Sequence, residues 1–346
     1  MRHALLLFLA LLPSAKADGQ GKEQQGLPPN QLPLTSVNGV AQGTTYHVKY
    51  YDSKNRNFKV QIDSILADFD RSLSLYRQDS EISEFNKTES FTFRSPYFYP
   101  VLKKSKEVYE ATKGAFDPTV MPLVEAYGFG AKRAKDPENV NVDSLLKLIG
   151  FQNIQFDASS VKKTKPYVRL DFNGIAQGYS VDLVGAFLQK KGINRFMVEI
   201  GGEILCKGMK NEGKSWVAGI ENPLRPGTLF STVKLADRAM TTAGNYRNHF
   251  EKNGQVFNHI INPKTGSMEQ SSVLSVTVFA PDAITADGYD TAFFLMGLEE
   301  TKQFVAKRKD LDVYIIYSDA SGKINPYASD GIRDFITEGK NALEKK

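Results

Sequence analysis

The sequence predicts an α+β fold in which a single large domain holds almost all of the chain. Segments with strand-like and helix-like patterns are mixed along the 346 residues, without the strict βαβ rhythm of a doubly wound parallel sheet. We find no internal repeat that would divide the chain into similar units. A chain of this length buries a large core, in one domain or in two closely joined halves.

The first half of the chain contains one predicted strand and two predicted helices. The alternating segment 44–50 predicts a strand and the start of ordered structure. Four apolar residues at helical spacing predict the first helix: Ile62, Ile65, Leu66 and Phe69. A polar loop follows over 73–86, where D-S-E-I-S (79–83) offers capping residues for a short turn. A second helix is predicted over 97–112 and ends at Gly114.

The second half adds irregular structure, further helices and three strands. The segment 114–124 is predicted to be ordered but irregular, because its prolines exclude a regular helix or a central strand. A helix is predicted over 175–190, with Gly192 as its C-terminal stop, and another over 286–296. Runs rich in β-branched and aromatic residues predict strands at 195–200, 273–279 and 313–317.

The N-terminus predicts export. Residues 1–17 have the pattern of a signal peptide: Arg2, a short apolar run, and Ala15-Lys16-Ala17 as a small-x-small cleavage site. The apolar run is too short for a permanent membrane anchor, and no cysteine follows it to carry a lipid. We therefore expect an exported, periplasmic protein; the alternative is a buried N-terminal helix.

The mature chain divides into three predicted parts. Residues 18–37 are rich in Gly, Gln and Pro and predict a flexible tether. The domain itself is predicted over 38–335. The charged residues 336–346 predict a fraying tail.

Composition excludes several classes of function. The net charge of +5 falls to +3 without the signal peptide, and no basic block or stripe favours nucleic acid or an anionic membrane surface. Cys206 is the only cysteine, so neither an intramolecular disulfide nor a cysteine-based zinc site can form. The motifs of Rossmann dinucleotide binding, P-loop hydrolysis, α/β-hydrolase chemistry and zincin chemistry are all absent.

The segment A-D-G-Y-D-T-A at 286–292 is the most informative part of the sequence. In a helix, Asp287 and Thr291 lie four residues apart on one face, so a carboxylate and a hydroxyl point the same way. Such oxygen ligands suit a hard divalent cation such as Mg²⁺. The alternative is a carboxylate that only stabilises the start of the helix. Gly288 costs the helix about 1 kcal/mol relative to alanine, which suggests a close approach to the backbone.

Two further segments offer polar groups. In D-F-N-G-I-A-Q-G (171–178), the turn before a helix can supply a carbonyl for a metal and N–H groups for a phosphate, or Asp171 can simply cap a tight turn. His259, beside the N-P-K-T-G turn, is either a general base or a buried structural histidine.

Aromatic and backbone groups suggest a flat ligand. Tyr76 is predicted to stack on a ring, and the 115–117 backbone together with Asp117 to bond its edge. The alternative for Tyr76 is a place at the edge of the core.

Eight segments in fixed order resemble the ApbE family, the FAD:protein FMN transferases, from about residue 38 to 335. They are G-T-T-Y-H-V-K-Y, S-L-Y-R-Q-D-S-E-I-S-E-F-N, G-A-F-D-P-T-V-M-P-L-V, L-D-F-N-G-I-A-Q-G-Y-S-V-D, V-E-I-G-G-E-I, T-T-A-G-N-Y-R-N-H-F, H-I-I-N-P-K-T-G and A-D-G-Y-D-T-A-F-F-L-M-G. The resemblance implies an α+β enzyme with a T-fold-like core that binds FAD and Mg²⁺.

The resemblance also assigns roles to residues. Asp287 and Thr291 correspond to side-chain metal ligands and the Gly174 carbonyl to a backbone ligand, while Asp290 occupies a variable position beside the metal. His259 corresponds to a histidine proposed to assist the transfer. The implied flavin-dinucleotide contacts are Tyr76, Ala115, Phe116, Asp117, Asp171, Gln177, Ile260 and Ile261.

The chain departs from the family pattern at three positions. Gln42 replaces a usual methionine, so an apolar contact to FAD becomes polar. Gln177 replaces a common lysine, and Asn262 replaces a common aspartate. None of the three is an expected metal ligand, so they bear on affinity rather than on the reaction.

The implied activity is Mg²⁺-dependent transfer of the FMN half of FAD to a threonine hydroxyl of an acceptor protein, with release of AMP. The implied acceptors carry a Gly-Ala-[Ser/Thr]-x-Thr-like motif and include subunits of membrane electron-transfer complexes; no nucleic acid is expected. Two alternatives stay open: an FAD pyrophosphatase that yields FMN and AMP, and a non-catalytic flavin-binding protein.

Overall fold

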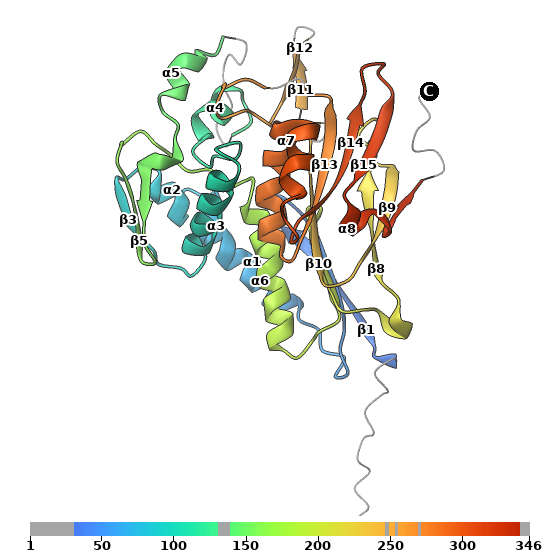
Figure 1. Ribbon diagram of the computed structural model, residues 1–346. Helices are drawn as coiled ribbons and strands as arrows, with labels where there is room; N and C mark the ends of the chain where they lie inside the picture. The colour runs from blue at the N-terminus through green and yellow to red at the C-terminus, as the bar shows by residue number, and fades with distance from the viewer. Residues whose placement is uncertain (1–30, 131–138, 246–248, 253–254, 269–270, 340–346) are drawn as a thin grey trace, which may run out of the picture.

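Helices and a small sheet cover opposite faces of an eight-stranded sheet (Figure 1). The structure, a computed structural model, describes residues 31–130, 139–245, 249–252, 255–268 and 271–339. The predicted signal peptide and most of the predicted tether lie outside these residues.

Every strand pair in the described residues is antiparallel, which confirms the predicted α+β class over a doubly wound parallel sheet. The order of the large sheet is β1-β2-β6-β7-β10-β13-β14-β15. Its strands are β1 (Leu34–Ala41), β2 (Thr44–Tyr51), β6 (Phe196–Ile200), β7 (Glu203–Lys207), β10 (Arg238–Gly244), β13 (Val273–Ala280), β14 (Asp312–Ser318) and β15 (Ile324–Ala328).

The long helices pack on one face of this sheet (Figure 1). The helices are α1 (Lys59–Leu73), α2 (Glu81–Phe85), α3 (Phe98–Ala111), α4 (Met121–Ala126), α5 (Val142–Leu146), α6 (Ala176–Lys190), α7 (Ala283–Val305) and α8 (Asp330–Arg333). Helices α6 and α7 pack against each other and against the middle of the sheet. This pair carries most of the residues discussed below.

Three smaller sheets complete the described residues. They are β16-β9-β8 (Ile336–Glu338, Leu229–Leu235, Trp216–Glu221), β3-β5-β4 (Ser90–Thr92, Ser160–Lys163, Ile154–Phe156) and β11-β12 (His249–Lys252, Gln255–Asn258).

The large sheet separates two hydrophobic cores. Because neighbouring side chains of a strand point to opposite faces, Val278 of β13 packs in the core under the helices, whereas Phe279 packs in the core under β8 and β9. Trp216 and Phe230 belong to the second core. Both faces of the central strands are therefore buried, which explains why 273–279 and 313–317 are continuous apolar runs.

The predicted helices and strands are confirmed, with small shifts at their ends. The turn within 79–83 is α2, and the Ser80 side chain caps it by accepting the N–H of Ser83. Gly114 and Gly192 both have the positive φ angles, 79° and 82°, of glycines that end helices. The prediction for 114–124 is wrong in part, because Met121–Ala126 is helical. Pro122 lies in its first turn, where the missing N–H removes no helical hydrogen bond.

Two predicted boundaries need correction. Strand β1 begins at Leu34, so the tether that we predicted to end at residue 37 is four residues too long, and order does not begin at residue 44. Only Val37 of this edge strand is buried, which is why its sequence gives little signal. The predicted tail 336–346 begins with Ile336–Glu338, which pairs with β9. In the part of the chain described, no helix combines the length and apolar character needed to span a bilayer.

Candidate active site

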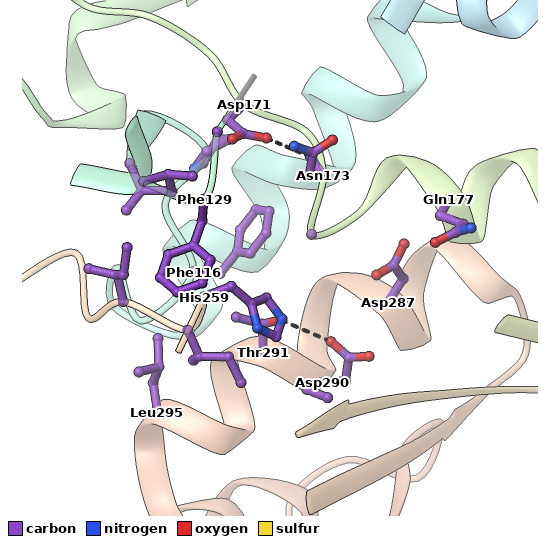
Figure 2. A pocket seen from close by; sticks show the side chains of 18 of the residues that line it. Phe116, Phe129, Asp171, Asn173, Gln177, His259, Asp287, Asp290, Thr291 and Leu295 are labelled. Atoms are coloured by element: carbon purple, nitrogen blue, oxygen red, sulfur yellow. Dashed lines mark hydrogen bonds between the residues drawn. The ribbon is translucent and has the colours of Figure 1, made fainter. Parts of the chain in front are cut away.

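All of the predicted site residues line one cavity of about 950 Å³, although they come from six separate parts of the chain. These residues are Gln42, Tyr76, Ala115, Phe116, Asp117, Asp171, Gly174, Gln177, His259, Ile260, Ile261, Asp287, Asp290 and Thr291. Figure 2 shows the centre of the cavity, with Asp287, Asp290, Thr291 and Leu295 along α7.

Helix α7 is fixed at its N-terminus by two carboxylates. Asp282 is the N-cap and accepts the N–H of Thr285. Asp182 of α6 accepts the N–H groups of Ala283 and Ile284, each at 2.8 Å. Burial raises the pKa of Asp182 to about 7. These bonds satisfy N–H groups that the helix itself leaves unpaired, and they tie α7 to α6.

Asp287 lies where α6 and α7 come closest. Its Oδ2 accepts the N–H of Gly178 at 2.7 Å, and burial raises its pKa to about 7 against the effect of this bond. A Cβ atom on Gly178 would lie 2.3 Å from the Ala283 carbonyl oxygen and 2.7 Å from the Asp287 Cβ. A glycine is therefore needed here for the two helices to approach and for the carboxylate to be held.

A prediction follows for Gly178→Ala. We expect the free energy of unfolding to fall by about 1–3 kcal/mol, because the added methyl meets a backbone carbonyl rather than a side chain that can move. Denaturant unfolding measures this. The control is Gly185→Ala in the same helix, where the nearest obstacle is the Leu205 side chain. Equal stability of the two variants would contradict the argument.

Gly288 has a structural explanation. A Cβ atom there would lie 3.0 Å from Ile175 Cδ1 and 3.1 Å from Val108 Cγ2, so the glycine gives room to side chains of neighbouring elements. The close approach that the sequence suggested is packing, and it does not by itself indicate a ligand.

Asp290 and Thr291 complete the polar face of α7. The Thr291 hydroxyl donates to Asp290 Oδ1 at 3.2 Å. Burial, and then the neighbouring charge of Asp287, raise the pKa of Asp290 well above its usual range, and the hydroxyls of Thr241 and Thr291 act in the opposite direction. Neither carboxylate has an ion-pair partner among the described residues.

The donor set fits a hard divalent cation. A Cβ atom on Gly174 would lie 4.0 Å from Thr291 Oγ1, so the Gly174 backbone is next to the hydroxyl. Asp287, Thr291 and the Gly174 carbonyl thus offer the oxygen ligands that Mg²⁺ prefers, beside buried negative charge without a cationic side chain. Elsewhere in the described residues, no three His, Cys, Asp or Glu side chains gather into a metal-binding group.

Asp171 holds the turn that precedes α6. Its Oδ1 accepts the N–H of Asn173 at 2.8 Å, and its own N–H donates to the Pro118 carbonyl at 2.7 Å (Figure 2). Burial raises the pKa of Asp171 to about 6. The predicted capping role and a place in the cavity wall are therefore both correct. Whether Asp171 contacts a ligand stays a prediction.

The Asp117 carboxylate is already bonded within the protein. It accepts the N–H and the hydroxyl of Thr119, at 2.8 and 2.6 Å, and the N–H of Phe151 at 3.3 Å. Its role in the structure is to shape the 115–118 loop. This leaves the loop backbone, rather than the carboxylate, as the better candidate for contact with a ring edge.

One end of the cavity is apolar. Phe116, Phe129, Ile260 and Leu295 line it (Figure 2). The His259 ring packs edge-on against Phe129, with 6.4 Å between ring centroids. His259 therefore belongs to a partly apolar wall and also lines the same cavity as the α7 carboxylates.

Gln42 and Gln177 lie beside two tight turns. Gln42 has a positive φ of 54° in the turn between β1 and β2, and its Oε1 lies 3.1 Å from the Ser180 hydroxyl. Gln177 lies against Gly201, where a Cβ atom would come within 2.4 Å of its Nε2. Both amide side chains thus have defined neighbours within the protein.

Tyr76 is 69% exposed although it lines the cavity. An exposed aromatic ring at the mouth of a cavity is suited to stacking on a planar ligand. The alternative, a place at the edge of the core, is not supported by this exposure.

We expect Tyr76→Ala to weaken FAD binding by about 2–12-fold, the range for the loss of one aromatic contact, and Tyr76→Phe to leave it nearly unchanged. Titration of flavin fluorescence measures both. Tyr167→Ala, at an exposed tyrosine outside the cavity, is the control. Equal loss in the phenylalanine variant would show that the hydroxyl, not stacking, matters.

Sequence reasoning missed several residues of the cavity wall. Phe129, Asn173 and Leu295 line it, as do residues 242–244 of β10. Leu295 follows Thr291 by four residues on the same helix, so its spacing was an available signal. Nothing in the local sequence places β10 beside α7, because that contact depends on the order of strands in the sheet.

Comparison with known proteins identifies similar chains over nearly the whole length. The family model described as "ApbE family" matches residues 42–315. FAD:protein FMN transferase of Vibrio cholerae is 34% identical over 87% of this chain and 92% of its own. The protein of that name from Haemophilus influenzae is 35% identical over 90% and 91%.

Solved structures agree. The flavin transferase ApbE from Vibrio cholerae has a TM-score of 0.79 and 32% identity, and the match covers 88% of this chain and all of that one. The apo flavinyl transferase ApbE of Pseudomonas stutzeri has a TM-score of 0.78 at 27% identity, with 89% and 98% coverage.

Proposed function

This chain belongs to the ApbE family, and on that basis we propose that it transfers the FMN moiety of FAD to acceptor proteins. The observation that carries the proposal is the single cavity that joins the α7 carboxylates, the glycine turn before α6 and His259. Mixed helices and strands in one domain, as in the ApbE structures, are consistent with it. The finer proposals below concern the acceptor group, the metal and the compartment.

We propose that the acceptor group is a threonine hydroxyl and that AMP is the leaving group. The threonine Oγ forms a bond to the phosphorus of the FMN half, and the bond from that phosphorus to the bridging oxygen breaks. The electron pair leaves with AMP. His259 accepts the threonine proton, a step worth about 10²–10⁴ in rate. Phosphoryl transfer needs mostly positioning and charge neutralisation, which a rigid cavity provides.

We propose that Asp287, Thr291 and the Gly174 carbonyl hold Mg²⁺, with Asp290 beside it. When bound, the metal supplies positive charge that polarises the phosphoryl group and stabilises the departing AMP. The Gly178 N–H orients the Asp287 carboxylate for this purpose, since it holds Oδ2 at 2.7 Å. The acidic helix face is then neutral overall only when a cation is present.

We propose that FAD lies along the cavity with one ring against the apolar wall and Tyr76 at the mouth. The wall residues Phe116, Phe129 and Ile260 offer an apolar surface, and the 115–117 backbone offers polar groups for a ring edge. Gln42 and Gln177 provide polar contacts in place of the usual methionine and lysine.

The test is incubation of the mature protein with FAD, Mg²⁺ and an acceptor domain. Covalent flavin fluorescence on the acceptor, resistant to denaturing gel electrophoresis, supports transfer. Free FMN without acceptor labelling would indicate an FAD pyrophosphatase instead. Bound but intact FAD in every condition would refute an enzymatic role.

We also propose export to the periplasm, based on the signal-peptide pattern of residues 1–17. Acceptors would then be exported flavoproteins or membrane electron-transfer subunits with a Gly-Ala-[Ser/Thr]-x-Thr-like motif. N-terminal sequencing of the secreted protein tests export: a mature chain that starts near Asp18 is expected, and an intact Met1 would contradict it.

A further inference from the structure

The eight-stranded sheet has a gap beside the active site. Strand β10 pairs with β13 along 239–244, but on its other side β7 pairs only with 238–240. Within the part of the chain that the structure describes, residues 241–244 have no strand partner on the β7 side. The eight-stranded sheet is thus open for about 10 Å at this place.

The gap exists because β7 starts late. The chain leaves β6 through Gly201 and Gly202, whose φ angles are 61° and 109°, and β7 begins at Glu203. The turn is held by Glu199 Oε1, which accepts the Gly202 N–H at 2.8 Å. This turn stops the β6–β7 hairpin short, while β10 continues past it.

The open edge faces the cavity. Residues 242–244 line it, together with Gly201 at the end of the hairpin. In an antiparallel strand the N–H and C=O groups of successive residues point alternately to the two sides, so half of the backbone groups of 241–244 point away from β13. Such groups need hydrogen-bond partners, and an unpaired strand edge is a template for another chain.

We propose that this edge of β10 is the docking site of the acceptor: an extended segment of the acceptor protein adds to it as a β-strand and brings its hydroxyl to the transfer site. The inference rests on the proposed function, since it names how the protein substrate is held. It adds a binding surface to a site otherwise described only by its metal and dinucleotide contacts.

The position of the edge suits a polypeptide substrate. β10 packs against α7, and the Thr241 hydroxyl acts on Asp290, so the edge runs next to the carboxylates that would hold the metal. Four residues at strand spacing match the backbone repeat of an extended peptide. The aromatic groups that suit planar rings, Phe116, Phe129 and Tyr76, belong to other parts of the chain.

Strand pairing also gives the segment an orientation. Side chains of an added strand alternate between the two faces of the sheet, so the reactive side chain and those two residues away face α7. Backbone pairing holds this register whatever the other side chains are. One edge can therefore serve acceptors that differ around the modified residue.

The test is a backbone scan of the acceptor, which leaves the protein unchanged and so cannot disturb its folding. The probe is a synthetic ten-residue peptide with a Gly-Ala-Ser-Ala-Thr segment and a fluorophore. Each amide nitrogen is methylated in turn, which removes one N–H donor at a time. Peptide binding by anisotropy and kcat/KM for FMN transfer are measured with the mature protein, FAD and Mg²⁺.

We expect methylation at every second position to lower kcat/KM by about tenfold or more, and methylation between these positions to change it less than about twofold. FAD affinity should stay constant across the series, and peptide and FAD should bind together. A peptide that does not bind, a loss without two-residue periodicity, or competition between peptide and FAD would overturn the inference. Competition would assign the edge to the dinucleotide.

The proposed function can fail separately from this inference. Transfer to a whole acceptor domain without periodicity in the peptide series would refute only the docking mode. Absence of transfer to any acceptor would refute the proposed function, whatever the peptide binding shows.

Discussion

Asp287→Ala is expected to lower the rate of FMN transfer by at least about 10³-fold at saturating Mg²⁺, because charge stabilisation by a bound metal is worth several kcal/mol. Asp287 is buried, is held by the Gly178 N–H, and has no ion-pair partner among the described residues. Its removal takes away the side-chain carboxylate that we assign to the metal.

Asp287→Asn separates metal binding from folding. The amide keeps an oxygen that can accept the Gly178 N–H and removes a buried charge, so we expect the metal-free variant to melt at or above the wild-type temperature. Isothermal titration with Mn²⁺ should still show weakened metal binding. Glu299→Ala, an exposed acidic residue on the same helix, is the control. Wild-type turnover in either Asp287 variant would refute the metal site.

His259→Ala is expected to lower kcat for transfer by about 10²–10⁴-fold, the usual contribution of a general base. The KM for FAD should change little if the histidine acts on the acceptor proton rather than on dinucleotide binding. Initial rates with an acceptor domain, measured over a range of pH, check both expectations, since loss of the base also removes its limb of the pH profile.

The control for this variant is His47→Ala. The His47 side chain is 52% exposed, pairs with Glu199, and does not line the cavity. It should keep wild-type kcat. A His259→Ala enzyme that loses FAD affinity but retains kcat would instead assign the histidine to the apolar wall that it shares with Phe129.

The elements that were predicted well carry strong local signals. Helix α6 begins at a glycine turn and ends at Gly192, and the central strands are continuous apolar runs because both of their faces are buried. Strand β1 was missed because seven of its eight residues are not buried, so its stability comes from backbone pairing with β2. Local sequence does not record such pairing.

The cavity wall divides in the same way. Leu295 continues a helical spacing already recognised, whereas residues 242–244 enter the wall only because β10 lies between β7 and β13. Asp117 shows the reverse error: the residue type suggested a ligand contact, but Thr119 and Phe151 already bond its carboxylate.

The sequence by itself determined the fold class, the family resemblance, and the oxygen-bearing residues Asp287 and Thr291 on one helix face. These follow from periodicity and residue type, which act over a few residues. Only the tertiary structure decided that Gly178 orients Asp287 and that Asp182 holds the start of α7, since these bonds join residues more than 100 positions apart. The open edge of β10 likewise depends on where β7 begins. Contacts of this kind arise from the packing of whole elements, and no local pattern contains them.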